Sequence, residues 1–243
     1  MKRIKLDAID STNSFLKELA RNSALENFTT VTTNHQKKGR GQQASSWVSE
    51  KGKNLTFSTF VSFLSLEVKR QRYLNFAISL AVLEALNNFN VSNLRIKWPN
   101  DILVGDHKIA GILIENSIYN SQIQSSIIGI GLNVNQETFA SFHRKATSLK
   151  ICMQKEFDLE LVLQSILESL VRAIALLNEG SFDLLEQQYL HYLYKKNVPT
   201  TFKNSKNILF MGMIQGVSSE GKLQILLENS TVEEFGIKEV SFA

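Results

Sequence analysis

Residues 94–115 read LRIKWPNDILVGDHKIAGILIE, and this stretch decides the fold. Two short apolar segments, 94–97 and 102–104, each have the length and composition of a strand. Gly105 and Asp106 then form a tight-turn signal before the apolar segment 108–115. The stretch therefore predicts a short strand followed by a β-hairpin.

The segments on either side extend this pattern. Further strands are expected at 29–33, 55–62 and 123–134. Helical apolar spacing marks 73–86, 159–177 and 182–194, and a short helix follows Ser11-Thr12-Asn13, whose side chains suit a helix start. Elements in this order predict an α+β fold with a mixed, largely antiparallel sheet backed by helices.

The pattern changes near residue 196. Short strands are expected at 198–202, 208–217, 223–227 and 231–235, separated by turn sequences such as SEGK at 219–222. We expect a small SH3-like β-barrel over residues 196–243, appended to a larger domain over residues 1–195.

Composition excludes several classes of protein. The 243 residues include 43% hydrophobic and 21% charged side chains, which is typical of a globular chain. The net charge of +4 permits an anionic partner, but the scattered basic residues favour a solvated surface. Cys152 is the single cysteine, which excludes an internal disulfide framework. With no signal-peptide or membrane-spanning pattern, a soluble, cytoplasmic protein is expected.

No common catalytic signature is present. The histidines are isolated and lack the spacing of metal-binding motifs. They are His35, His107, His143 and His191. The chain also has no Gly-x-Ser-x-Gly motif, Walker loop or dinucleotide-binding fingerprint. We therefore expect neither a histidine-held catalytic metal nor acyl-serine chemistry.

A long polar stretch, 34–54, contains QKKGRGQQA at 36–44, followed by Trp47. Gly39 and Gly41 let the backbone approach a ligand closely, and the Arg40 guanidinium can bind a carboxylate or phosphate through two hydrogen bonds. The segment alone fits an anion site and an ordinary basic turn equally well.

The KWPND segment at 97–101 places a cation, an aromatic ring, an amide and a carboxylate between two strands. Lys97 can neutralise a transferring phosphoryl or acyl group, and Asp101 can help to hold Mg²⁺. Read singly, these residues fit a solvated lysine and a turn aspartate better. Lys108 can bring a second cation, while Gly129 and Gly131 indicate either room for a flat ligand or a β-bulge.

Taken in order, several motifs are similar to those of the biotin protein ligase family, across about residues 1–195. The motifs are Ser11-Thr12-Asn13, Gln36 with Gly39-Arg40-Gly41, Trp47, Lys97 to Asp101, Lys108 to Leu113, and Gly129 to Asn133. The resemblance implies the class II synthetase-like biotin/lipoate ligase fold. It also implies that biotin attacks ATP, with Mg²⁺, to form biotinyl-5'-AMP and pyrophosphate, and that a lysine of a biotin carboxyl carrier domain then accepts the biotin.

Site residues follow from the same resemblance. Arg40 and Lys97 are expected to be catalytic. Positions matching biotin contacts are Ser11, Thr12, Asn13, Gln36, Gly39, Arg40, Gly41, Gln42 and Lys97. Positions expected to bind ATP are Arg40, Trp47, Asn100, Asp101, Lys108 and Asn133. The loop over 34–54 is expected to fold over the adenylate, with Trp47 as apolar cover.

Two departures from the family pattern matter. Gln42 and Ala44 stand where a second arginine and a later glycine are common, so weaker retention of the adenylate is expected. The Ser-Thr-Asn element begins at residue 11, so we expect a short form without a DNA-binding domain. A lipoate or octanoate ligase remains the main alternative, and a nucleic-acid-binding module a weaker one. The sequence leaves open the carrier, the role of the C-terminal domain, and whether the chain is a monomer or homodimer.

Overall fold

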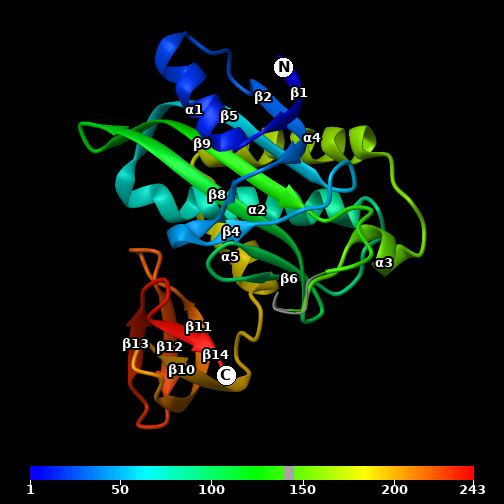
Figure 1. Cartoon of the computed structure of the whole chain (residues 1–243). Coiled ribbons are helices and arrows are strands. Elements are labelled where there is room, and N and C mark those ends of the chain that lie inside the picture. Colours follow the sequence, from blue (N-terminus) through cyan, green and yellow to red (C-terminus); the bar gives the residue numbers. More distant parts are fainter. Residues whose placement is uncertain (140–144) are drawn as a thin grey trace.

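The computed structural model describes residues 1–139 and 145–243, and His143 lies outside them. Its main body is a seven-stranded sheet with strand order β1-β2-β5-β9-β8-β7-β6 (Figure 1). The strands are β1 (Arg3–Ile9), β2 (Thr30–Gln36), β5 (Leu55–Glu67), β6 (Leu94–Lys97), β7 (Asp101–Val104), β8 (His107–Tyr119) and β9 (Gln122–Leu132). Within this sheet β1 and β2 pair in parallel and the other neighbours pair antiparallel. The expected mixed, largely antiparallel sheet is confirmed.

The two faces of this sheet carry different elements. One face packs against α2 (Gln71–Asn87) and α4 (Leu159–Asn178), with α5 (Phe182–Tyr192) against α2. The other face carries α1 (Thr12–Asn22) over β5 and β9. Because side chains alternate along a strand, Ile128 and Ile130 join the large core, whereas Ile127 packs near Leu16 of α1. Because α1 is short, it covers only part of this face, and a binding site can lie on the part that it leaves uncovered.

The helix α2 is more deeply enclosed than its sequence pattern suggested. Its buried residues include neighbours in sequence, such as Ile78 and Ser79, rather than one stripe. The sheet, α4 and α5 surround it and cover most of its circumference. Because α2 is buried around most of its circumference, it is the central helix of the core.

The C-terminal strands form a second, five-stranded antiparallel sheet in the order β13-β12-β11-β10-β14. The strands are β10 (Pro199–Asn204), β11 (Leu209–Val217), β12 (Leu223–Leu227), β13 (Val232–Phe235) and β14 (Val240–Phe242). Figure 1 shows this sheet beside the main body, reached from the end of α5. Phe202, Ile214 and Ile225 belong to the same continuous apolar core as α2. The small C-terminal β domain expected from the sequence is confirmed.

The polar stretch 34–54 is more ordered than a plain loop. Strand β2 continues to Gln36, and β3 (Gly39–Arg40) pairs antiparallel with β4 (Ser46–Trp47). A single 3-10 turn, η1 (Gln42–Ala44), joins these two short strands. The remaining short elements are η2 (Val68–Arg70) and α3 (Leu149–Met153). Across the described parts of the chain, no helix combines the length and apolar character needed to cross a membrane.

Candidate functional site

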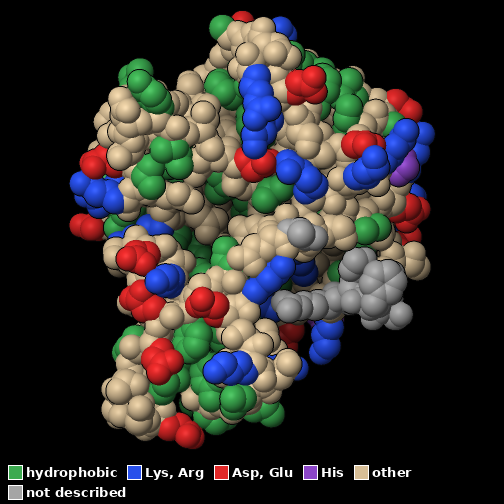
Figure 2. All heavy atoms as spheres, turned by 60° about the vertical axis from the view of Figure 1, so that its left-hand side comes forward, with side chains coloured by type: hydrophobic (Ala, Val, Ile, Leu, Met, Phe, Trp, Pro, Cys, Tyr) green, Lys and Arg blue, Asp and Glu red, His purple; other side chains and the backbone are tan. Residues whose placement is uncertain are grey.

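A cavity of about 530 Å³ lies on the α1 face of the main sheet. Figure 2 shows the surface hollowed between the main body and the smaller C-terminal sheet, with basic side chains near the opening. All but one of the site residues predicted from the sequence line this cavity: Ser11, Thr12, Asn13, Gln36, Arg40, Gly41, Gln42, Trp47, Lys97, Asn100, Asp101, Lys108 and Asn133. Residues from five separate stretches of sequence are thus brought together.

Gly39 is the predicted site residue that does not line the cavity. It pairs with Trp47 across the β3–β4 ladder. A Cβ at Gly39 would collide with the carbonyl oxygen of Trp47 and come within 2.7 Å of Gln36 Nε2. The missing side chain therefore lets the two short strands meet and places Arg40 and Trp47.

Glycines form the floor of the cavity. Gly129 and Gly131 alternate along β9 on the α1 face, and Gly111 lies opposite Gly131 on β8. A Cβ on Gly129 would come within 2.9 Å of Asn13 Cγ, and one on Gly131 within 2.7 Å of Trp47 Cδ2. The ladder keeps its register at both β9 glycines, so the β-bulge interpretation is wrong. These glycines instead make room for the Asn13 and Trp47 side chains.

A buried polar network occupies one end of the cavity. Ser11 caps α1 by accepting a hydrogen bond from the Ser14 backbone. Gln36 Oε1 accepts hydrogen bonds from the Thr12 backbone N–H at 2.9 Å and from its hydroxyl at 3.2 Å. Ser58 Oγ lies 2.7 Å from Thr12 Oγ1 and 2.5 Å from Asn13 Oδ1. This network holds hydroxyl and amide groups in a fixed arrangement at the cavity wall.

Ser58 is a site residue that the sequence reasoning missed. It lies on β5 and is fully buried. Its position within a serine- and threonine-rich strand gave one available signal, because a fully buried hydroxyl requires a partner. The partners, however, come from α1, far away in sequence.

The KWPND segment joins β6 to β7 at the opposite end of the cavity. Asn100 fastens it to β8, donating from Nδ2 to the Ile112 carbonyl at 2.7 Å. Asp101 Oδ1 lies 2.6 Å from Lys108 Nζ, and this pair is partly buried. Lys97, at the end of β6, places its Nζ 4.8 Å from the centroid of the Phe242 ring. The cavity is thus lined by Lys97 and by a Lys108 charge that Asp101 partly offsets.

Arg40 reaches Glu115 at the other end of β8. Arg40 Nη2 lies 2.6 Å from Glu115 Oε2, which also accepts a hydrogen bond from Asn13 Nδ2 at 3.0 Å. Lys17 Nζ of α1 lies 3.1 Å from Glu115 Oε1. Burial alone would raise the pKa of Glu115, but the hydrogen bonds from Asn13 and Lys17 and the Arg40 charge lower it below its ordinary value. Glu115 therefore remains ionised at neutral pH.

Glu115 was also absent from the sequence-based site. Side chains on β8 alternate between faces, so Gly111, Leu113 and Glu115 share the face that carries the cavity. A charged residue at the end of the apolar run IAGILIE was the available signal. Its pairing with Arg40 depends on how β3 lies against the sheet.

The C-terminal sheet supplies another wall of the cavity. Ile237, Lys238 and Phe242 line it. Lys238 Nζ donates to the Gln43 carbonyl of η1, so the wall is tied to the segment that carries Arg40. The Phe242 ring also lies near Tyr194, at a centroid distance of 5.4 Å. The cavity is therefore closed by residues from both ends of the chain.

Two polar atoms in the lining are buried without a hydrogen-bond partner among the described residues. They are Gln42 Oε1 and Trp47 Nε1. A buried acceptor or donor that forms no hydrogen bond costs about 1–3 kcal/mol of folding free energy. Their position in the cavity wall is consistent with partners that a bound molecule supplies.

Comparisons with known proteins agree on one family. The model of the biotin/lipoate A/B protein ligase family matches residues 6–133. The bifunctional ligase/repressor BirA of Bacillus spizizenii is 31% identical over 238 residues, covering 96% of this chain and 70% of that protein. The biotin–[acetyl-CoA-carboxylase] ligase of Paracoccus denitrificans is 34% identical over 131 residues, about half of each chain.

A solved structure extends the similarity to the whole fold. The biotin protein ligase from Aquifex aeolicus, in complex with biotin and ATP, matches with a TM-score of 0.80 and 26% identity. The match covers 100% of this chain and 98% of that one, and so includes the C-terminal sheet. By sequence and by architecture, this chain belongs to the biotin/lipoate A/B protein ligase family.

Proposed function

We propose that the chain is an ATP-dependent biotin protein ligase. It activates biotin as biotinyl-5'-AMP and transfers it to a lysine of a biotin carboxyl carrier domain. The observation that carries this proposal is one cavity lined by Arg40, Lys97 and Lys108, in whose wall Gln42 Oε1 and Trp47 Nε1 are buried without a hydrogen-bond partner among the described residues. The similar proteins named as biotin ligases support biotin as the acid.

In the first step a carboxylate oxygen of biotin attacks the α-phosphate of ATP, and pyrophosphate leaves. The reacting groups are both anions, so the main requirement is a set of fixed positive charges that offsets their repulsion. Arg40 and Lys97 supply these charges from opposite ends of the cavity. The Asn13–Ser58–Thr12 network offers donors and acceptors that suit the ureido ring of biotin.

Magnesium fits this cavity as a companion of ATP. Among residues 1–139 and 145–243, no group of three or more His, Cys, Asp or Glu side chains could hold a metal ion. Mg²⁺ is often held by one or two carboxylates together with substrate phosphates. Asp101, now paired with Lys108, is the carboxylate that would contact it in this proposal. The ion would neutralise charge on the phosphates.

In the second step the amine of the carrier lysine attacks the acyl carbon, AMP leaves, and the amine loses a proton to solvent. The mixed anhydride must be kept from water until the carrier arrives. Trp47 and the C-terminal wall are placed to cover it, the latter tied to the Arg40 segment through Lys238. We also propose that residues 1–195 form the catalytic domain and 196–243 a separate small domain that completes this cover, in a cytoplasmic enzyme.

The test is to mix the purified chain and Mg-ATP with biotin or with lipoate. Pyrophosphate release and the mass gain of a biotin carboxyl carrier domain are then measured. The proposal predicts both signals with biotin and neither with lipoate. Both signals with lipoate alone would support the lipoate ligase alternative. Absence of pyrophosphate with either acid would contradict an adenylating function altogether.

A further inference from the structure

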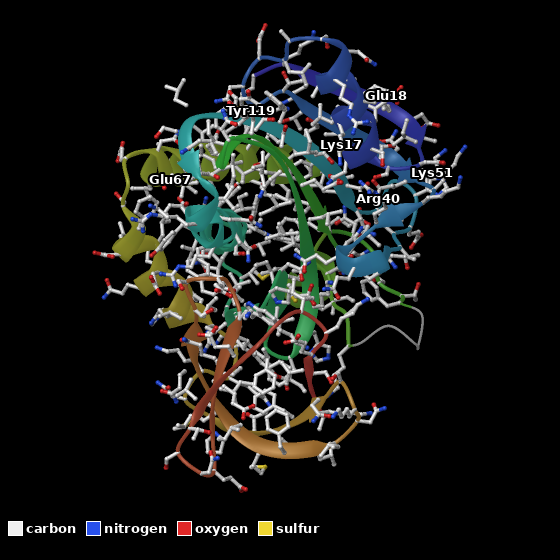
Figure 3. All side chains as sticks on the ribbon, turned by 90° about the vertical axis from the view of Figure 1, so that its left-hand side faces the viewer. Lys17, Glu18, Arg40, Lys51, Glu67 and Tyr119 are labelled. Atoms are coloured by element: carbon white, nitrogen blue, oxygen red, sulfur yellow. The ribbon has the colours of Figure 1, made fainter. Side chains whose placement is uncertain are left out.

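A charged cluster of Lys17, Glu115 and Arg40 lies at the rim of the cavity, meaning the edge that Arg40 lines. Lys17 and Arg40 are labelled in Figure 3. Lys17 comes from α1, Arg40 from β3 and Glu115 from β8. Arg40 and Lys17 are almost half exposed, at 45% and 46%, while Glu115 is only 19% exposed. One mostly covered carboxylate is thus shared by two cations that solvent and ligands can reach.

The bonds of this cluster are unequal. Arg40 approaches Glu115 Oε2 through Nη2 alone, so the two-bond geometry that makes arginine–carboxylate pairs strong is not used. Glu115 keeps two further partners, Asn13 Nδ2 on Oε2 and Lys17 Nζ on Oε1. Departure of Arg40 therefore leaves Glu115 hydrogen-bonded and still paired with a cation. Because these partners remain, the mostly covered carboxylate is not left as an unpaired buried charge when Arg40 leaves.

We propose that Glu115 is a positioning residue that holds Arg40 at the rim and yields it to a ligand carboxylate or phosphate, while Lys17 retains Glu115. Glu115 and the ligand anion compete for the same guanidinium. Lys17 makes the exchange easier, because it neutralises the carboxylate that Arg40 leaves behind. This inference rests on the proposed function, since it requires that Arg40 meets an anion in the cavity.

The exchange predicts that substitutions of Glu115 and of Lys17 change the affinity for the anion in opposite directions. Glu115→Gln removes the competing charge, so the anion should bind more tightly, by about two- to fivefold for one partly exposed ion pair. Lys17→Met leaves Glu115 dependent on Arg40, so the anion should bind more weakly, by about the same factor. In the double variant the Lys17 substitution should lose its effect. A merely structural role for the cluster would weaken binding in both single variants.

The experiment is a calorimetric titration of each variant with biotin, with Mg-ATP and with the uncharged biotin amide. Matched controls are Glu18→Gln on α1 and Lys51→Met, which remove the same charges nearby (Figure 3). They should shift the dissociation constants by much less than the cluster variants. Arg40→Met should abolish the effect of Glu115→Gln. Thermal unfolding of each variant establishes that the fold is intact.

The outcomes separate the possibilities. The opposite-sign pattern with biotin identifies the carboxylate as the competing anion, and the same pattern with Mg-ATP identifies the phosphate. Equal shifts with biotin amide would overturn the exchange, because the amide carries no charge. Same-sign or absent shifts with both anions, while the wild type binds them, would also overturn it. If the wild type binds neither biotin nor Mg-ATP, the proposed function fails instead.

Discussion

The indole of Trp47 lies against the backbone of Gly131, with room for no side chain between them. A Cβ at residue 131 would come 2.7 Å from Trp47 Cδ2, which is closer than carbon atoms approach. Gly131→Ala should therefore displace Trp47 and open the cover of the cavity. We expect the KM for biotin and ATP to rise on the order of tenfold, because a misplaced wall disturbs the positioning of the reactants.

Steady-state kinetics of pyrophosphate release measure this effect. Gly216→Ala, in the C-terminal sheet, is the control. A Cβ at this residue would meet no atom nearer than 3.6 Å. Unchanged kinetics in Gly131→Ala would show that the Trp47–Gly131 contact is irrelevant to substrate binding.

Ser58→Ala should raise the KM for biotin while leaving kcat nearly unchanged. The substitution deprives Asn13 Oδ1 of its buried donor, at a cost of about 1–3 kcal/mol. Chemical denaturation and biotin titration measure both consequences. Ser79→Ala is the matched control, because Ser79 is equally buried on α2 and its hydroxyl has no partner among the described residues. Equal destabilisation by the two substitutions would contradict this role for Ser58.

Phe242→Leu should raise the KM for ATP by about two- to fivefold. The substitution preserves most of the apolar contact but removes the ring beside Lys97, a cation–π interaction of about 0.5–1 kcal/mol. Phe210→Leu removes another packed ring from the same sheet, at a residue that does not itself line the cavity. A comparable rise in KM with Phe210→Leu would assign the effect to general loosening of that sheet.

Gln42→Arg should reduce the escape of free biotinyl-adenylate. Gln42 lines the cavity and can donate hydrogen bonds there, but it carries no charge to hold a phosphate. Chromatographic detection of free adenylate during turnover without a carrier measures retention. Gln124→Arg, on an exposed position of β9, adds the same charge elsewhere. If the wild type releases no adenylate, the weaker retention expected from Gln42 is wrong.

Tyr194→Phe should change the stability of the protein at alkaline pH. Burial, and then the hydrogen bond to Asp106 at 2.7 Å, raise the pKa of Tyr194 to about 12 from 10.0. A raised pKa means that the neutral phenol stabilises the fold fully below pH 10 and that this contribution disappears as pH rises toward 12. The wild type should therefore lose thermal stability more steeply than Tyr194→Phe over this range. Tyr119→Phe, at an exposed position, is the control, and the same change in both variants would contradict the prediction.

The elements with strong local patterns could be predicted from the sequence. Each expected strand and helix is present, because the apolar spacing of segments such as 73–86 and the turn at Gly105 act locally. β1 was missed because Arg3–Ile9 alternates charged and apolar residues at a mostly exposed edge. Its parallel pairing with β2 requires α1 to cross over between them, and that depends on tertiary packing.

The site was predictable where motifs resemble a known family, and less so where the fold brings distant residues together. Arg40 and Lys97 were expected at the site, and both line the cavity. Ser58, Glu115 and Phe242 were not, because each acts through a partner on another element. The biotin contact expected for Gly39 stays a prediction, and in the structure Gly39 pairs with Trp47 across the β3–β4 ladder.

The wall that Phe242 and Lys238 provide makes the cavity a joint product of distant parts of the chain. Ser11 and Phe242 lie far apart in the sequence, and both line the same cavity. Shielding a reactive anhydride from water therefore depends on the packing of the C-terminal sheet against the main body. Loss of that packing would expose the anhydride even where the glycine floor is intact.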